Sequence, residues 1–444
     1  MGGSASTDLR HLVIVGASFS GMSLLGLVQK NFKITLIDKR EFFDWTCGTP
    51  HMILSDPEYF EDNVTVDLNQ AVNTDRIFGQ NVTFVQGYLE ELINENFIRI
   101  KKTKGKKGDQ LQTLPAEEIH FDYLVICTGA TYSINEDLEG MFNIFSKKEK
   151  GELLAKYRSS IDKAKSVVVV GGGPTGVETM AELLMKYGQD KKLGIVTNAD
   201  HLLVGYPDKA GTSAATHFEA KGVKVYTNTK FTPESKLAEE YEYAINCVGT
   251  KFHSPFLDKS FKDCKDARGR IFVNEYFQVT NVNPCEPSRD EHIPHLKVLK
   301  SIFCFGDAAF TRMDEVKNIP AIKASAPVVA YNLKQLDKGN TGLKEMPYAV
   351  DMMSVVYYDK WKGTMTVNRC VFSACCAFKM KQDMEKPYFG FLKNKSCGKC
   401  KFSMFNCQNA CMGCCFSMCC CGCSSRAQRK VRREELRKIF NEDK

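Results

Sequence analysis

A glycine-rich turn near the N-terminus has the residue types and spacing of a phosphate-binding loop. It reads GASFSG at residues 16–21, follows an apolar run and precedes a second apolar run that ends at Asp38. In a strand–turn–helix–strand unit, such a turn brings backbone amides to a pyrophosphate at a helix N-terminus, and the acid accepts a hydrogen bond from a ribose hydroxyl. We therefore predict a dinucleotide site at Gly16, Ser18, Gly21 and Asp38. The alternative is a generic unit of an α/β sheet without a ligand.

A second unit of this kind begins at Ser166, with Gly171, Gly173 and Gly176 in the full GxGxxG spacing. Here the middle position is glycine, whereas the first turn has Ser18 there. Two such units predict two nucleotide sites, and hence two cofactors or a cofactor and a nucleotide substrate. The strand after the second unit ends at Thr197-Asn198, without an acid or an arginine cluster, so the sequence does not decide between NADH and NADPH.

Two further apolar runs end in small residues. The run FDYLVICTGA at 121–130 ends at Thr128 and Gly129, and SIFCFGDAA at 301–309 contains Gly306 and Asp307. Small residues at a strand end let the backbone lie against a cofactor at the carboxyl edge of a sheet. We therefore add these four residues to the predicted cofactor site.

The elements that must position these residues follow from the apolar pattern. We expect strands at 12–15 and 33–37, a helix at about 22–30, an antiparallel insertion at 81–112 and a hairpin at 269–279. Residues 347–371 are also strand-like. Strands alternating with helices predict an α/β fold.

Composition sets broad limits on partners and compartment. The chain has 444 residues, a net charge of +7 and 19 cysteines, nine of them scattered through the first 376 residues. The modest charge gives no reason to expect a nucleic-acid partner. Scattered cysteines in an α/β chain are typical of reduced, buried side chains in the cytosol. Residues 1–9 are small and polar, so no secretory signal is expected.

Together these motifs resemble the two-dinucleotide-binding-domain flavoproteins. Within that superfamily the chain is most similar to the apoptosis-inducing-factor-like, ferroptosis-suppressor quinone reductases, and it is also similar to type II NADH dehydrogenases. The resemblance rests on both glycine turns, the Thr128-Gly129 strand end, FGDAA at 305–309, REFFDWT at 40–46, VNEYFQV at 273–279 and the start MGGSAS. It covers roughly residues 12–380. The segment 319–333 lacks the paired glutamines that type II dehydrogenases place near the quinone, which leaves the acceptor open.

The resemblance implies two Rossmann-like domains, FAD in the first and NAD(P)H in the second, plus a small C-terminal α+β domain and a Cys-rich tail. The implied boundaries are 1–10 for an acylation segment, 11–150 and 261–340 for the FAD-binding domain, 151–260 for the NAD(P)H-binding domain, 341–392 for the C-terminal domain and 393–444 for the tail. It implies an FAD-dependent NAD(P)H:quinone-type oxidoreductase, and a homodimer is compatible with it. Glu178, in GGGPTGVE, matches the glutamate near the nicotinamide–flavin contact. Alternatively, Glu178 and Glu182 simply share a helix face.

Cys47 gives a second interpretation of the chemistry. Flavin disulfide reductases carry a C-x4-C pair near this position, and residue 52 here is Met52, which excludes a dithiol. A single-cysteine disulfide or peroxide reductase that uses Cys47 remains open, as does a purely structural cysteine. A nucleotide-sensing flavoprotein without turnover is the third alternative.

Both ends of the chain carry membrane-targeting patterns. Gly2 in MGGSAS fits N-myristoylation, and ten cysteines lie between 397 and 423, ahead of the basic segment 426–444. S-palmitoylation fits these cysteines best, whereas a metal site at Cys397-x2-Cys400 and a disulfide scaffold are the alternatives. The predicted palmitoylation sites are Cys414, Cys415, Cys419, Cys420, Cys421 and Cys423. We therefore expect a chain that is peripheral on a cytosolic membrane face, without a metal and without a transmembrane helix.

Overall fold

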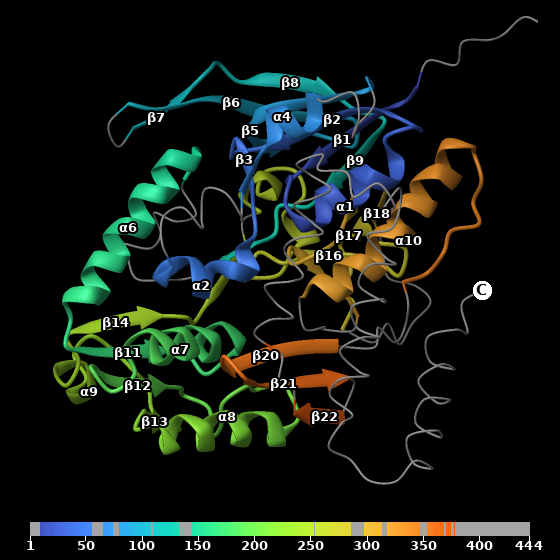
Figure 1. Ribbon diagram of the computed structural model, residues 1–444. Coiled ribbons are helices and arrows are strands. Elements are labelled where there is room, and N and C mark those ends of the chain that lie inside the picture. The colour runs from blue at the N-terminus through green and yellow to red at the C-terminus, as the bar shows by residue number, and fades with distance from the viewer. Residues whose placement is uncertain are drawn as a thin grey trace, which may run out of the picture.

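The computed structural model describes residues 9–55, 65–73, 80–107, 110–132, 144–252, 254–285, 297–312, 318–346, 353–367, 370–373 and 377. Its architecture is α/β, as predicted, with one mixed sheet and one parallel sheet flanked by helices and a small antiparallel sheet beside them (Figure 1). Gly2 and the six predicted palmitoylation sites lie outside the described residues.

The larger sheet is built around the first glycine turn. Its nine described strands have the order β17-β18-β9-β1-β2-β5-β6-β7, with β8 paired to β6. The strands are β1 (His11–Val15), β2 (Lys33–Asp38), β5 (Val82–Leu92), β6 (Phe97–Lys107), β7 (Gln110–Thr113), β8 (Glu117–His120), β9 (Tyr123–Ile126), β17 (Gln278–Thr280) and β18 (Val298–Cys304). The parallel order β18-β9-β1-β2 brings four carboxyl ends to one edge. Residues 12–15 of β1 and all of β9 are apolar and buried because both faces of this part of the sheet are covered.

Strand β5 changes the sheet from parallel to antiparallel. Its first half pairs in parallel with β2, and from Gly87 onward it pairs antiparallel with β6. A Cβ at Gly87 would lie 2.6 Å from the carbonyl oxygen of Lys101, so this crossing needs a glycine. The predicted antiparallel insertion at 81–112 is confirmed as β5 to β7, which lie with β8 at the top of Figure 1.

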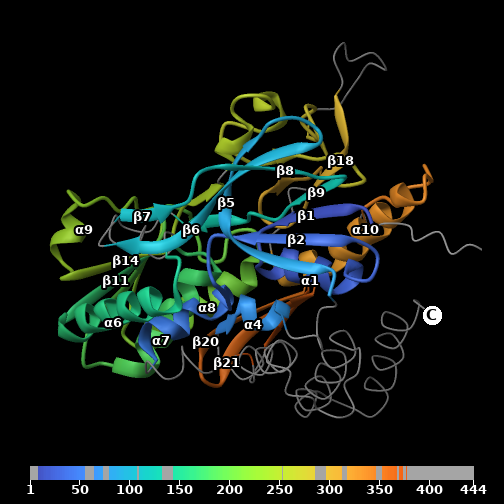
Figure 2. The ribbon, with the colours of Figure 1, turned by 90° about the horizontal axis from the view of Figure 1, so that it is seen from above.

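Helix α1 (Phe19–Val28) and helix α10 (Ile319–Asp337) pack against each other beside the parallel strands (Figures 1 and 2). Helix α1 begins three residues before the predicted helix, with Ser18 at its N-cap position. Asn318 caps α10 by accepting a hydrogen bond from the Ala321 amide at 2.9 Å. The two helices therefore start near the carboxyl edge of the sheet.

The second sheet carries the second glycine turn. It is parallel throughout and has the order β13-β12-β11-β14. Its elements are β11 (Ser166–Val170), α7 (Pro174–Tyr187), β12 (Lys192–Val196), α8 (Asp208–Ala220), β13 (Lys224–Tyr226), α9 (Lys236–Glu239) and β14 (Tyr243–Asn246). Helix α6 (Lys147–Lys163) precedes this sheet and begins with a capping box between Ser146 and Glu149.

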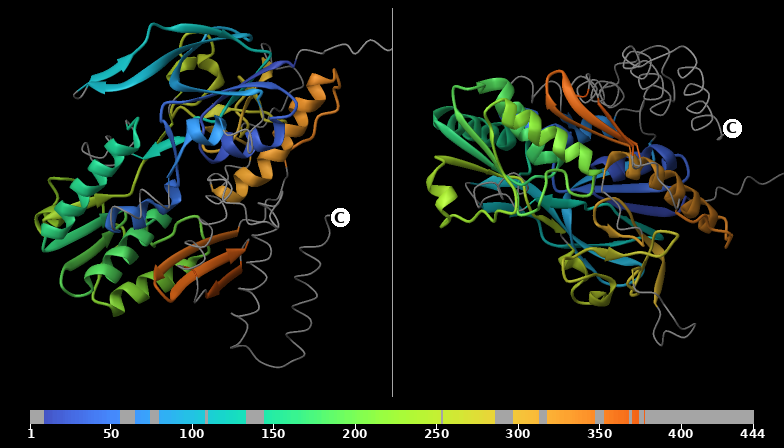
Figure 3. Two further views of the ribbon diagram at one scale, coloured as in Figure 1. Left: turned by 45° about the horizontal axis from the view of Figure 1, so that its top comes forward. Right: turned by 90° about the horizontal axis from the view of Figure 1, so that it is seen from below.

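Two chain crossings and one small sheet join these parts. The crossings, β10 (Ala130–Tyr132) and β15 (Thr250–Phe252), pair antiparallel. The small sheet consists of β20 (Met353–Asp359), β21 (Lys362–Val367) and β22 (Cys370–Ser373). It packs on α7 and α8, as Figures 1 and 3 show.

The shorter elements are β3 (Phe42–Asp44), η1 (Thr46–Gly48), α2 (Thr49–Leu54), β4 (Thr65–Asp67), α4 (Leu68–Asn73), η2 (Pro255–Leu257), η3 (Lys262–Cys264), β16 (Ile271–Phe272) and β19 (Ala309–Phe310). The predicted hairpin at 269–279 is present in part. The antiparallel bridge Val273–Val279 and the bond from the Asn274 amide to the Gln278 carbonyl at 2.9 Å join its arms, while β16 pairs with β19 and β17 with β18. Within the described residues, no helix is both long and apolar enough to cross a bilayer.

Candidate nucleotide-binding and redox site

The first glycine turn is fixed by backbone contacts that exclude side chains. Gly16 has φ +107°, and a Cβ there would lie 2.2 Å from the Cys127 carbonyl oxygen at the end of β9. A Cβ at Gly21 would lie 1.8 Å from the carbonyl oxygen of Gly16. The turn, β9 and α1 therefore approach so closely that both positions need glycine.

Ser18 shows why the middle position tolerates a side chain. Its backbone is extended, with φ −93° and ψ −154°, which any L-residue adopts. Its side chain makes no capping hydrogen bond to α1. The departure from glycine thus costs no backbone strain, and it leaves a hydroxyl at the start of the helix.

Asp38 holds the turn directly. Its Oδ2 accepts a hydrogen bond from the Ala17 amide at 2.7 Å, and its Oδ1 accepts one from the Arg40 amide at 2.8 Å. A carboxylate oxygen has two lone pairs, so each keeps one acceptor position for a ribose hydroxyl. Asp38 therefore fixes the shape of the loop through its bonds to two backbone amides.

The strand ends at Thr128 and at Gly306 also lie next to the first glycine turn. A Cβ at Gly306, where φ is +82°, would lie 2.1 Å from Ser20 Oγ in the first turn of α1. Next to it, Asp307 is half-buried. The buried Thr128 Oγ1 makes no hydrogen bond to the described part of the chain, so a bound group can supply its partner. The structure thus brings the turn at Gly16–Gly21 together with Thr128 and Gly306, which lie more than 100 residues away in the sequence.

The second turn repeats the first. Gly171 has φ +123°, and a Cβ there would lie 2.8 Å from the Cys247 carbonyl oxygen, while one at Gly176 would lie 1.8 Å from the Gly171 oxygen. At Gly173, by contrast, a Cβ would meet nothing within 4 Å. This open space precedes the N-terminus of α7, where a phosphate is favoured. The geometry of both turns fits a dinucleotide.

Helix α7 carries two buried carboxylates one turn apart. Glu178 and Glu182 are 3% and 5% exposed. Glu182 Oε1 accepts a hydrogen bond from the Tyr357 hydroxyl at 2.6 Å, and its Oε2 lies 3.0 Å from His51 Nδ1. One carboxylate therefore joins α2, α7 and β20. Sequence reasoning found Glu182 only as the helical neighbour of Glu178, and it missed His51 and Tyr357.

A buried ion pair stands near the start of the first domain. The Lys150 ammonium on α6 donates to Asp44 Oδ2, and Arg40 Nη1 lies 3.3 Å from the same oxygen. Burial lowers the pKa of Lys150, and the Asp44 carboxylate opposes this shift. Burial likewise lowers the pKa of Lys39 and that of Lys323 on α10 to about 8 each.

The described cysteines form no disulfide. Cys47 in η1 is exposed, whereas burial raises the pKa of the Cys247 and Cys264 thiols to about 11 and that of Cys127 well above its ordinary value. The buried thiols are therefore inert packing groups. Within the described residues, no cluster of three His, Cys, Asp or Glu could hold a metal ion.

A family model described as pyridine nucleotide-disulphide oxidoreductase matches residues 10–285, which include both glycine turns. The chain belongs to this family. Members of the family are oxidoreductases that use FAD and NAD(P)H, and the two turns of this chain fit these cofactors. The sequence prediction of fold class, enzyme class and cofactors is thereby confirmed.

Relatives within the family extend the comparison. The chain is 27% identical to ferroptosis suppressor protein 1 of Xenopus tropicalis, over 61% of this chain and 70% of the relative. It is 24% identical to the type II NADH:quinone oxidoreductase of Staphylococcus saprophyticus, over 60% and 71%. The solved sulfide:quinone oxidoreductase of Aquifex aeolicus shares the fold with a TM-score of 0.63 and 18% identity, over 87% of this chain and 92% of that one.

Proposed function

We propose that this chain transfers two electrons from NAD(P)H through FAD to a quinone-type acceptor at a membrane surface. The observation that carries the proposal is the presence of two glycine turns with the same geometry. In each turn, a Cβ at the first and last glycine would overlap a backbone carbonyl oxygen. The His51–Glu182 contact links the helix after Cys47 to the helix after the second turn. A relative named a type II NADH:quinone oxidoreductase supports the class of acceptor.

The reaction balances as NAD(P)H plus a proton plus quinone, giving NAD(P)⁺ and quinol. FAD, when bound, supplies the redox chemistry between the two-electron donor and the acceptor. In this proposal Gly16, Ser18, Gly21, Asp38, Thr128, Gly129, Gly306 and Asp307 hold FAD. Gly171, Gly173 and Gly176 hold the pyrophosphate of NAD(P)H.

Two carboxylates on α7 have different proposed roles. Glu178, in the first half of the helix, faces the nicotinamide end of the nucleotide and is the catalytic residue. Glu182 is a positioning residue, since its two oxygens are already engaged by Tyr357 and His51. Both side chains are buried, which favours fixed orientations.

The membrane placement combines the two ends of the chain. We propose myristoylation at Gly2 and palmitoylation at Cys414, Cys415, Cys419, Cys420, Cys421 and Cys423. One myristoyl chain binds membranes only marginally, so the cysteines and the basic segment would provide the second signal. A lipid-soluble quinone would explain why the enzyme is held at a membrane.

Stopped-flow kinetics of the flavin-loaded chain test the function. We expect NADH or NADPH to bleach the flavin absorbance and a short-chain ubiquinone to restore it. Because Cys47 has no role in this path, Cys47→Ser should retain both rates, whereas Glu178→Gln should slow bleaching by about 10² to 10⁴ if it acts in proton transfer or orientation. Bleaching that ubiquinone does not reverse would overturn the proposed acceptor.

The exposure of Cys47 favours one second candidate, a single-cysteine disulfide or peroxide reductase. In that case a disulfide or peroxide, and not ubiquinone, would reoxidise the flavin. Cys47→Ser would then abolish reoxidation and leave bleaching by NAD(P)H intact. The same stopped-flow experiment therefore separates the two candidates.

A further inference from the structure

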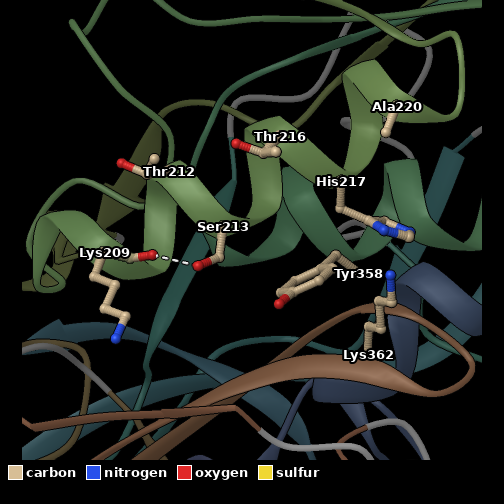
Figure 4. Close-up of a pocket in the computed structure, with 8 residues that line it drawn as sticks. All are labelled: Lys209, Thr212, Ser213, Thr216, His217, Ala220, Tyr358 and Lys362. Atoms are coloured by element: carbon tan, nitrogen blue, oxygen red, sulfur yellow. Dashed lines mark hydrogen bonds between the residues drawn. The ribbon is translucent and has the colours of Figure 1, made fainter.

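A pocket of about 580 Å³ lies away from both glycine turns, between α8 and the small sheet (Figure 4). One face of α8 and the strands β20 and β21 form its walls. The lining residues are Lys209, Thr212, Ser213, Thr216, His217, Ala220, Tyr358 and Lys362. The opposite face of α8, with Ala210, Ala214 and Phe218, is buried.

Cations stand on two walls of this pocket. Lys209 comes from α8 and Lys362 from β21, and both are exposed. Figure 4 shows the Lys362 amine pointing toward the His217 ring. Ser213 Oγ donates to the Lys209 carbonyl oxygen at 2.7 Å and Thr212 Oγ1 to that of Asp208 at 3.0 Å, so these hydroxyl hydrogens are engaged. The charged donors that line the pocket are the two ammonium groups.

His217 adds a buried polar atom to the pocket. The residue is 7% exposed, and Asp359 Oδ2 lies 3.0 Å from its Nε2, so this carboxylate is the partner of the imidazole. The Asp359 carboxylate also offsets one of the two lysine charges, which leaves the pocket cationic.

The turn next to Lys362 carries an exposed aromatic side chain. Trp361 lies in the turn between β20 and β21 and is 64% exposed, with Lys360 Nζ 5.8 Å from its ring centroid. The other tryptophan of the chain, Trp45, is 5% exposed. Tryptophan between lysines is typical of side chains that lie at the headgroup level of a membrane.

We propose that this pocket binds the phosphate group of an anionic phospholipid while Trp361 lies in the membrane interface. The inference rests on the membrane placement proposed above, and it names the surface that faces the bilayer. It requires neither acyl chains nor a particular electron acceptor. Lys362 would contact the phosphate as a point charge, Lys209 at the other end of the pocket would face the anionic surface, and Trp361 would bury its ring beside the headgroup.

Trp361 fluorescence provides the test, with full-length chain made in bacteria so that it carries no acyl groups. Phosphatidylcholine vesicles with phosphatidic acid should shift the emission to the blue, and vesicles without it should not. Lys209→Ala and Lys362→Ala should each weaken vesicle binding about fivefold, the effect of one basic residue near an anionic surface. Lys230→Ala, at an exposed position in the same domain, is the matched control. The basic segment 426–444 is present in every variant, so it cancels in the comparison.

The Trp361→Phe variant shows whether the blue shift of the emission comes from Trp361, because this substitution should abolish the shift. Equal binding by Lys362→Ala, Lys209→Ala and Lys230→Ala would overturn the proposal, as would a blue shift with neutral vesicles. If inorganic phosphate binds to the chain and vesicles do not, the ligand is a soluble phosphate and the lipid assignment is wrong. Turnover with a water-soluble quinone should be unchanged in all these variants, so failure of lipid binding is distinguishable from failure of the proposed reaction.

Discussion

The hydroxyl of Tyr357 on β20 donates a hydrogen bond of 2.6 Å to Glu182 on α7, and both side chains are buried. The second oxygen of the same carboxylate lies 3.0 Å from His51 on α2. Three segments that are remote in sequence thus meet at one acid. A hydrogen bond to a buried charged group is among the stronger ones in a protein.

Removing the Tyr357 hydroxyl should therefore destabilise the chain. We expect Tyr357→Phe to lower the free energy of unfolding by about 1.5–3 kcal/mol, because Glu182 would lose a donor in a buried place. Urea denaturation measures this. Tyr226→Phe, which removes a 3.3 Å bond between two neutral hydroxyls, should cost less and serves as the control. Equal losses would show that the charge on Glu182 is irrelevant.

The second glycine turn offers a matched pair of substitutions. A Cβ at Gly176 would overlap the Gly171 oxygen, whereas one at Gly173 would meet open space. Gly176→Ala should lower the free energy of unfolding by about 1–3 kcal/mol through overpacking. Gly173→Ala should fold normally and weaken only nucleotide binding. Urea denaturation and NAD(P)H titration of the two variants decide this, and tight nucleotide binding by Gly173→Ala would contradict the phosphate placement.

The Lys150–Asp44 pair should matter more to stability when one partner is lost than when both are. Lys150→Met leaves the Asp44 carboxylate buried with only Arg40 beside it, at an expected cost of about 3–5 kcal/mol. The double variant with Asp44→Leu should recover most of this loss. Denaturant unfolding of the single and double variants forms the measurement, and a double variant as unstable as Lys150→Met would refute the charge argument.

Lys323 predicts a pH dependence of stability. Burial lowers its pKa in the folded chain from 10.5 to about 8. Between these two pH values the unfolded chain binds more protons, so the free energy of unfolding should rise with pH in that window. Lys323→Met should flatten this rise, while Lys39, with a similar pKa, keeps part of it. Urea denaturation from pH 8 to 10.5 measures the slope, and Lys230→Met should leave it unchanged.

Local patterns were sufficient to predict both glycine turns and their strands, because the contacts that require Gly16, Gly21, Gly171 and Gly176 lie within short strand–turn–helix units or at the adjacent strand end. Helix α1 starts three residues earlier than predicted, with Ser18 at the N-cap position but without a side-chain capping bond, so no capping signal marked its start. The family model matches residues 10–285, a range that includes both of these strand–turn–helix units.

The remainder depends on contacts across the chain. His51 and Glu182 are 131 residues apart, and Glu182 and Tyr357 are 175 apart, so no local spacing could reveal their meeting. The segment 269–279 has the alternation of a hairpin, yet its two strands find partners in β19 and β18. Pairing in this region is decided by the packing of whole sheets.

The strand order also determines how the protein can assemble during synthesis. Strand β9 lies between β1 and β18, and all strands of the four-stranded sheet lie between β9 and β18 in sequence. The four-stranded sheet can close as soon as residue 246 has left the ribosome, as an N-terminal-to-C-terminal order of domain folding allows. The first glycine turn must wait for Gly306 and α10. With FAD at the first turn and NAD(P)H at the second, as proposed, a chain that ends after residue 246 would contain every strand of the four-stranded sheet and lack the Gly306 and α10 contacts of the first turn.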